Sequence, residues 1–153
     1  MTNQNRYFKM NILAKAIMFA SEKHVDQSDK GGRAYILHPL RMMMRLRTND
    51  DELMSIAVLH DVVEDCKISF DDLKRLGMTD RVIEGVKSLT KQNGETYEQF
   101  IDRVSLNHDA MLVKREDLRD NSDITRLKGI SEKDIDRMTK YMIAFRKLDS
   151  LLK

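Results

Sequence analysis

Apolar residues recur along the chain at the three- and four-residue spacing of amphipathic helices. The stretch ILAKAIMFASEKH carries Ile12, Leu13, Ala16, Ile17 and Ala20 at this spacing, which would place them on one face of a helix. The same pattern returns in DELMSIAVLHDVVED, TDRVIEGVKSLTK, TYEQFIDRVSL and the final segment from residue 131 to residue 153. The chain is therefore predicted to be mainly helical.

Several of these stretches begin at side chains that favour helix starts. Asn49, Asp50 or Asp51 could cap the helix of DELMSIAVLHDVVED, and Thr79 could cap the next one. The last helix is predicted to begin at Ser131. Its apolar stripe is expected to pack against the rest of the protein and consists of Ile135, Met138, Met142, Phe145 and Leu148.

Signals for β-strands are almost absent, because no segment alternates apolar and polar residues over a sustained run rich in Val, Ile or Thr. The segments between the predicted helices are short and polar, among them DQSDKGGRA at residues 26–34. These features predict one all-α domain over residues 1–153, a helical bundle of about six or seven helices given a typical helix length of about eleven residues.

Composition narrows the function classes. The formal net charge is only +2, so no strong field for binding nucleic acid is expected. Arg41 and Arg45 share a helix face in RMMMRLR and form no more than a modest basic spot. The single cysteine, Cys66, excludes an intrachain disulfide and fits a reducing compartment. The polar N-terminus MTNQNRYFKM does not resemble a signal peptide, and no apolar run is long enough to cross a bilayer. We expect a cytoplasmic protein without membrane contact.

The segment VLHDVVEDCK combines an apolar face with four ionisable residues. If residues 52–65 are helical, His60 and Glu64 lie one turn apart, and Asp61 and Asp65 form a second such pair. Buried charges are costly unless they are paired or bind a metal. Imidazole and carboxylate together suit a divalent metal such as Mn, Fe or Zn, although exposed charge clusters on helices are commonly only solvated.

A metal site needs further ligands from other segments. Three residues have a suitable context: His38 in YILHPL, Asp117 in LVKREDLRDN, and His24 at the end of the first long helix. Pro39 favours an extended or turn conformation at His38. His24 fits a structural role better than that of a ligand, and Lys114 is expected to lie outside the site.

Together, the segments HVDQSDKGGRAYILHPLRM, AVLHDVVED and LVKREDLRDN resemble the HD-domain phosphohydrolases. The resemblance is to the RelA/SpoT-type hydrolases of (p)ppGpp and the small stand-alone alarmone hydrolases. It covers roughly residues 10–148, with the order and spacing of several motifs kept. It implies an HD-domain helical bundle and hydrolysis of the 3′-pyrophosphate of (p)ppGpp to give GDP or GTP.

The resemblance also implies roles for individual residues. The metal, Mn²⁺ by implication, would be held by His38, His60, Asp61 and Asp117. Glu64 and Asp65 match the pair that positions and activates the attacking water. The implied substrate contacts, which would neutralise and orient a phosphorylated nucleotide, come from Lys30, Asn121, Arg137 and Tyr141.

One departure from the family bears on the substrate. Asp29 stands where the family has an arginine that is implied to lie against the guanine base, and Arg33 in the same loop is a candidate substitute. Two alternatives therefore stay open beside (p)ppGpp hydrolysis. The chain could be an HD phosphohydrolase of another phosphorylated nucleotide, or a nucleotide-binding sensor without catalysis. A nucleotide is the expected partner in each case, and protein partners are not indicated.

Overall fold

Helices make up nearly all of the regular structure in the computed structural model, which describes residues 10–153. In chain order they are α2 (Ile12–Lys23), α3 (Leu37–Arg45), α4 (Asp51–Leu59), α5 (Val62–Asp65), α6 (Phe70–Arg75), α7 (Asp80–Leu89), α8 (Tyr97–Val104), α9 (His108–Asn121), the 3-10 helix η1 (Ile124–Arg126) and α10 (Glu132–Leu151). Within the described residues no β-strand forms, and only Ser28 and Ala34 make an isolated antiparallel bridge. The predicted all-α class is confirmed.

The expected capping residues begin three of these helices. The Asp50 side chain accepts hydrogen bonds from the backbone nitrogens of Glu52 and Leu53, both at 3.1 Å. Thr79 caps α7, and Ser131 forms a reciprocal capping box with Asp134 at the start of α10. Each cap satisfies backbone N–H groups that have no partner inside the helix.

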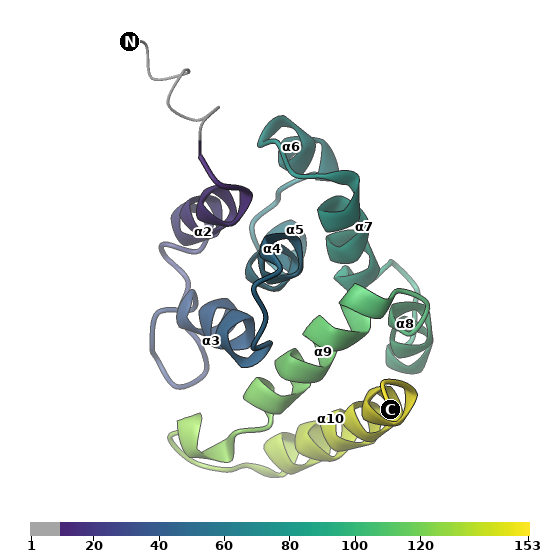
Figure 1. Ribbon diagram of the computed structural model, residues 1–153. Coiled ribbons are helices and arrows are strands. Elements are labelled where there is room, and N and C mark those ends of the chain that lie inside the picture. Colours follow the sequence, from purple (N-terminus) through teal and green to yellow (C-terminus); the bar gives the residue numbers. More distant parts are fainter. Residues whose placement is uncertain (1–9) are drawn as a thin grey trace.

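Helix α4 lies at the centre of the bundle and is surrounded by α2, α3, α7 and α9 (Figure 1). Ile56, Val58 and Leu59 of α4 have no exposed surface, so this helix forms the middle of the hydrophobic core. Helix α7 approaches α4 at Gly85, where an added Cβ would lie 2.5 Å from Cδ1 of Ile56. A residue without a side chain is thus required for this contact.

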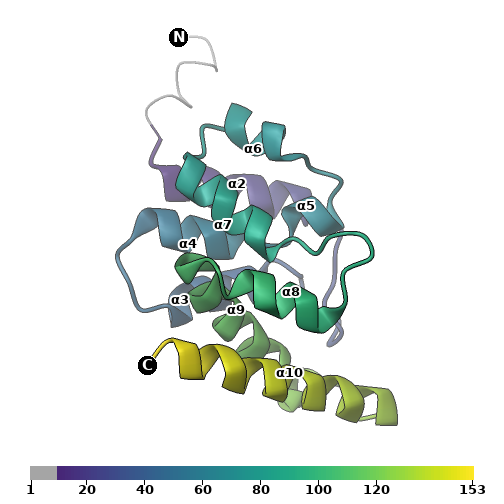
Figure 2. The same ribbon diagram turned by 90° about the vertical axis from the view of Figure 1, so that its right-hand side faces the viewer.

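Helix α10 packs along α9 at one side of the bundle (Figure 2). The prediction of an apolar stripe buried on α10 is partly wrong, because Ile135 and Met142 are 57% and 50% exposed. Ala144 and Leu148 are the buried residues of this helix. The face that meets α9 is therefore rotated from the one inferred from apolar residues alone.

The expected single helix over residues 52–65 is interrupted. Helix α4 ends at Leu59 and α5 begins at Val62, so His60 and Asp61 form the junction. Asp61 has φ −107° and ψ −3°, away from the helical φ near −63°. Because of this interruption and the short helices α5 and α6, residues 10–153 contain more helices than the six or seven expected.

Two other sequence expectations concern this part of the chain. His38 is helical, not extended, because α3 begins one residue before it, and Pro39 is tolerated in the first turn, where backbone N–H groups lack helical partners. Among residues 10–153, no helix has both the length and the apolar character needed to span a bilayer. The N-terminal segment judged unlike a signal peptide lies, apart from residue 10, outside the described residues.

Candidate metal centre and nucleotide pocket

The start of α3, the junction between α4 and α5, and α9 bring His38, His60, Asp61 and Asp117 together. One ligand atom from each of His38, His60 and Asp61 lies within 4.8 Å of the others. Oδ1 of Asp117 is 3.1 Å from Nε2 of His38 and 3.9 Å from Nε2 of His60. All four metal ligands proposed from the sequence are therefore neighbours, although they come from three separate segments.

The chemistry of this cluster fits a divalent metal ion. His60 is 3% exposed, and its Nδ1 atom faces the backbone oxygen of Ala57 at 2.8 Å. Its Nε2 atom is fully buried and makes no hydrogen bond, although Oδ2 of Asp61 lies 2.9 Å away. A buried ring nitrogen without a hydrogen bond, directed toward two carboxylates, is the arrangement expected of a metal ligand.

Asp117 is held from three sides. Lys114 places Nζ 2.6 Å from its Oδ2, and Asn121 donates from Nδ2 to its Oδ1 at 2.6 Å. Burial alone would raise the pKa of Asp117, but Lys114 and the contact with His38 lower it well below its usual range. The expectation that Lys114 lies outside the site is wrong, because its position three residues before Asp117 on α9 puts both side chains on one face.

A second carboxylate, Asp120, supports His38 from the other side of the ring. Its Oδ2 lies 2.7 Å from Nδ1 of His38, and its side chain has no exposed surface. Burial lowers the pKa of His38, but the contacts with Asp117 and Asp120 outweigh burial and raise it to about 9. Carboxylates in this place fix the orientation of a metal-binding imidazole.

Arginines surround Asp120. Arg41 donates to both of its carboxylate oxygens, at 2.8 and 2.9 Å, and Arg45 donates to Oδ1 at 2.8 Å. Arg126 donates to Oδ2 at 2.6 Å. Burial raises the pKa of Asp120, whereas His38 and the arginines lower it far more, so the carboxylate stays ionised. The basic spot expected at Arg41 and Arg45 thus stabilises a buried anion.

The two residues expected to activate water lie on α5, beside the cluster. Glu64 is exposed and accepts a hydrogen bond from the backbone nitrogen of Lys91. Partial burial raises its pKa, an effect that Asp61 reinforces and the Lys91 contact opposes. Asp65 accepts from Nε2 of Gln27 at 3.0 Å. Their place after Asp61 leaves both carboxylates open to solvent near the proposed ligands.

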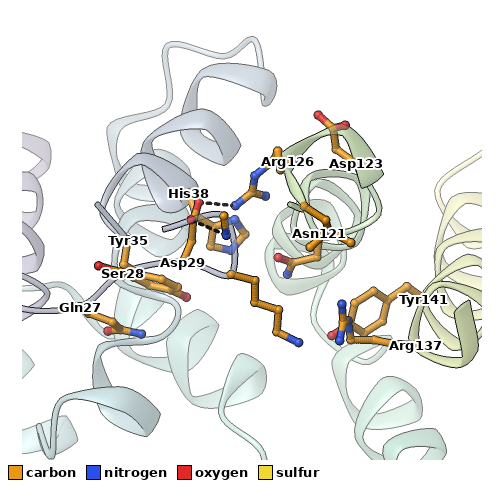
Figure 3. A pocket seen from close by; sticks show the side chains of 13 residues that line it. Gln27, Ser28, Asp29, Tyr35, His38, Asn121, Asp123, Arg126, Arg137 and Tyr141 are labelled. Atoms are coloured by element: carbon orange, nitrogen blue, oxygen red, sulfur yellow. Dashed lines mark hydrogen bonds and ion pairs between the residues drawn. The ribbon is translucent and has the colours of Figure 1, made fainter. Parts of the chain in front are cut away.

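A pocket of about 250 Å³ opens next to His38. The four residues expected to contact substrate all line it, from three elements: Lys30, Asn121, Arg137 and Tyr141. Figure 3 shows Arg137 and Tyr141 of α10 facing Asn121 of α9 and the loop before α3 across the opening. Burial, followed by repulsion from Arg137, lowers the pKa of Lys30. Two cations near each other in a pocket favour an anionic ligand.

Asp29 does not point into the pocket as a free carboxylate. Its Oδ1 accepts from the backbone nitrogens of Gly31 and Arg33, both at 2.9 Å, and its Oδ2 pairs with Arg126 at 2.9 Å. Arg126 lines the pocket, and dashed lines in Figure 3 mark its contact with the loop. Asp29 therefore shapes the loop, and the arginine beside Asp29 that lines the pocket is Arg126, not the suggested Arg33.

Several residues of this site, chiefly those that hold others in place, were not predicted from the sequence. Tyr35 donates its hydroxyl to Asp61, and nothing in its sequence context signals this. Asp120 could have been found from helical spacing, since it lies three residues after Asp117 and one before Asn121. His24 is not part of the cluster of His38, His60 and Asp61, and its Nδ1 lies 2.7 Å from Oε1 of Gln27.

No protein-family model matches the chain. Over 118 residues, 71% of its length, the chain is 32% identical to the guanosine-3′,5′-bis(diphosphate) 3′-pyrophosphohydrolase of Aquifex aeolicus. It is 36% identical over 117 residues to the enzyme of that name, MESH1, of Danio rerio. The chain is a relative of the (p)ppGpp 3′-pyrophosphohydrolases. It spans 17% of the Aquifex relative and 64% of the Danio relative.

The likeness to these hydrolases extends to the fold. A solved structure described as a metazoan ortholog of SpoT that hydrolyses ppGpp superimposes with a TM-score of 0.74 and 23% sequence identity. The match covers 93% of this chain and 94% of that one. The HD-domain helical fold expected from the motifs is thereby confirmed.

Proposed function

We propose that the chain is a metal-dependent hydrolase that removes the 3′-pyrophosphate of (p)ppGpp and releases GDP or GTP. One observation carries the proposal. Two imidazoles and two carboxylates form a cluster, and this cluster adjoins a pocket that contains Lys30 and Arg137. The names of the sequence relatives support the choice of substrate.

The metal in this proposal is Mn²⁺, held by His38, His60, Asp61 and Asp117. Mixed imidazole and carboxylate ligands suit this ion. When bound, such an ion supplies a more acidic water and a positive charge beside a phosphate oxygen. Tyr35 and Lys114 keep the two aspartates in place by hydrogen bonding to them.

Glu64 and Asp65 are proposed to take the proton from the attacking water. Both are open to solvent, and the raised pKa of Glu64 makes it a stronger base than an ordinary carboxylate. Gln27 holds one oxygen of Asp65 and lines the pocket. It would thus keep the base oriented toward bound substrate.

Lys30 and Arg137 are proposed to neutralise the phosphates of the nucleotide, while Asn121 and Tyr141 orient it. In the reaction, the water oxygen forms a bond to the phosphorus attached to the 3′ oxygen. The bond between that phosphorus and the 3′ oxygen breaks, pyrophosphate leaves, and the 3′ oxygen gains a proton.

The test is incubation of the purified protein with ppGpp and Mn²⁺, with products identified by mass. We expect pyrophosphate and GDP, and no turnover in the presence of a chelator. Asp61→Asn should abolish turnover, whereas Asp26→Asn, which changes an exposed aspartate of the pocket loop, should leave it unchanged. Undiminished hydrolysis by the Asp61 variant would refute the mechanism.

A second candidate is hydrolysis of another phosphorylated nucleotide, favoured by the position of Asp29. Because Asp29 is bound to Arg126, the loop differs from the arginine-bearing loop of the family. A panel of phosphorylated nucleotides assayed under the same conditions separates the candidates. Cleavage of another nucleotide with ppGpp untouched would favour this alternative, and binding without any turnover would favour a sensor.

A further inference from the structure

A second pocket, separate from the nucleotide pocket, lies between the end of α3 and the middle of α9. Its volume is about 470 Å³. Helices α3 and α9 run beside each other at this place (Figure 1). The pocket is lined by Arg45, Leu46, Arg47, Arg115, Glu116 and Arg119, none of which lines the nucleotide pocket. We call it the arginine pocket.

Positive charge exceeds negative charge in the arginine pocket. Its only lining carboxylate, Glu116, is 1% exposed and pairs with Arg119, at 2.9 and 3.0 Å. Asp149 lies 3.4 Å from Arg115, and Asp120 takes one hydrogen bond from Arg45. Since Asp120 is also shared with Arg41 and Arg126, the pocket retains an excess of guanidinium groups.

Among residues 10–153, Arg47 is the arginine of this pocket whose guanidinium no carboxylate binds, whereas Arg115 is paired with Glu116 and Asp149. The Nε atom of Arg115 is fully buried and lies 3.4 Å from Oε1 of Glu116, with which it forms an ion pair, so it is not available to a ligand. The side chain of Arg47 is exposed and has no carboxylate partner among residues 10–153. Arg47 also has φ 49°, a left-handed conformation uncommon for residues other than glycine. This backbone conformation ends α3 and places Arg47 at the rim.

We propose that the arginine pocket binds a phosphate-bearing anion. Guanidinium groups present planar donors that match phosphate oxygens and are more weakly hydrated than ammonium groups. The volume accommodates an oligophosphate or the phosphate end of a nucleotide. An anion there would accept hydrogen bonds from the exposed guanidinium of Arg47 and would be attracted by the positive charge of the arginines around it.

The pocket is connected to the metal cluster by two consecutive contacts. Nη1 of Arg45 lies 2.8 Å from Oδ1 of Asp120, and Oδ2 of Asp120 lies 2.7 Å from Nδ1 of His38. An anion that attracts Arg45 competes with Asp120 for this guanidinium. Binding in the arginine pocket therefore alters the hydrogen bond that orients His38. Only the consequence of this change for catalysis depends on the proposed function.

The test is calorimetric titration of the protein with inorganic pyrophosphate in the presence of a chelator, so that neither metal nor turnover contributes. The protein carries Lys30→Gln and Arg137→Gln, which remove the cations of the nucleotide pocket. We expect saturable binding of one pyrophosphate, weakened at least tenfold when Arg47→Gln and Arg115→Gln are added. A parallel titration with GDP distinguishes a nucleotide source of the phosphates from a free oligophosphate.

The matched control is Arg146→Gln, which removes an exposed arginine of α10 with no carboxylate partner among residues 10–153. It should leave pyrophosphate affinity unchanged. Because Arg115 contacts Glu116 and Asp149, Arg47→Gln alone is tested as well, and it should weaken binding without affecting thermal unfolding. Equal losses in the Arg47 and Arg146 variants, or none in either, would overturn the proposal. So would a single-stranded RNA that binds the site and that pyrophosphate cannot displace.

A second readout follows the connection to His38. In the protein that carries Lys30→Gln and Arg137→Gln, saturating pyrophosphate should shift the imidazole nitrogen signals of His38 in the nuclear magnetic resonance spectrum. The shift should vanish with Arg45→Gln. Signals of His38 that stay unchanged while pyrophosphate binds would overturn the connection between the two sites. Failure of ppGpp hydrolysis would affect neither measurement, so the two proposals fail independently.

Discussion

Oδ2 of Asp120 lies 2.7 Å from Nδ1 of His38, on the side of the ring opposite the contact between Nε2 and Asp117. The carboxylate is completely buried and is held by three arginines. It is thus placed to fix His38 with Nε2 directed toward the other proposed ligands.

Replacing Asp120 should weaken metal binding without removing a ligand. In Asp120→Asn the amide oxygen cannot serve His38 and three arginines at once, so the orientation of His38 is less constrained. We expect the affinity for Mn²⁺ to fall about 10- to 100-fold, the range for partners that orient metal-bound histidines, as measured by calorimetry. Asp136→Asn, at an exposed position on α10, is the control. An unchanged affinity in the folded Asp120 variant would rule out the positioning role.

Lys114 should stabilise the metal-free protein more than the metal-bound one. Its Nζ atom pairs with the 6%-exposed side chain of Asp117 at 2.6 Å, and Lys114→Met leaves a buried carboxylate without this partner. Breaking a buried pair in this way costs on the order of 3 kcal/mol. Urea unfolding should show the loss in chelator and a smaller loss with Mn²⁺, because the ion supplies positive charge to Asp117.

The control for Lys114 is Lys87→Met, which removes a 55%-exposed lysine that lies 3.8 Å from Glu84. This change should alter the free energy of unfolding by no more than about 1 kcal/mol, as for exposed ion pairs. Equal losses for Lys114→Met with and without Mn²⁺ would show that the ion and Lys114 do not act on the same carboxylate.

Restoring the family arginine at position 29 should harm the protein's nucleotide binding. Asp29→Arg removes the acceptor for the backbone nitrogens of Gly31 and Arg33 and puts a second guanidinium beside Arg126. We expect affinity for ppGpp to fall about tenfold or more, equivalent to about 1.4 kcal/mol. Asp26→Arg in the same loop is the control for charge alone. A gain of affinity in the Asp29 variant would mean that guanine recognition outweighs the order of the loop.

The ion pair between Glu95 and Arg103 should make stability depend on pH in the acid range. Hydrogen bonds from Arg103 hold the pKa of Glu95 at about 2, below its ordinary value of 4.5. The folded state therefore binds this proton less readily than the unfolded state. The stabilisation is present above pH 4.5 and is lost as the pH falls toward 2.

Unfolding of Glu95→Gln by urea at several pH values tests this sign. The difference in stability between the parent and this variant should be largest near neutral pH and should shrink below pH 4.5. Glu98→Gln, which changes an exposed carboxylate of the following helix, should show no comparable trend. A difference that grows on acidification would contradict the assignment.

Local signals in the sequence were sufficient for the helical class and for three of the helix starts. Asp50, Thr79 and Ser131 could be identified because a cap acts on backbone nitrogens only two or three residues away. The burial of α10 could not be predicted in the same way. Its apolar residues extend around more than one face, and the position of α9 decides which of them are covered.

The sequence by itself determined which residues could serve as ligands. His60 and Asp61 were found from their spacing, and His38 and Asp117 from motifs, because chemical type and order are properties of the chain. Only the tertiary structure decided how these side chains are held. Asp29 with Arg126, and Asp120 with His38, are separated by 97 and 82 residues. Contacts over such distances depend on how helices pack, and packing forces that act on a whole helix leave no pattern in a short stretch of sequence.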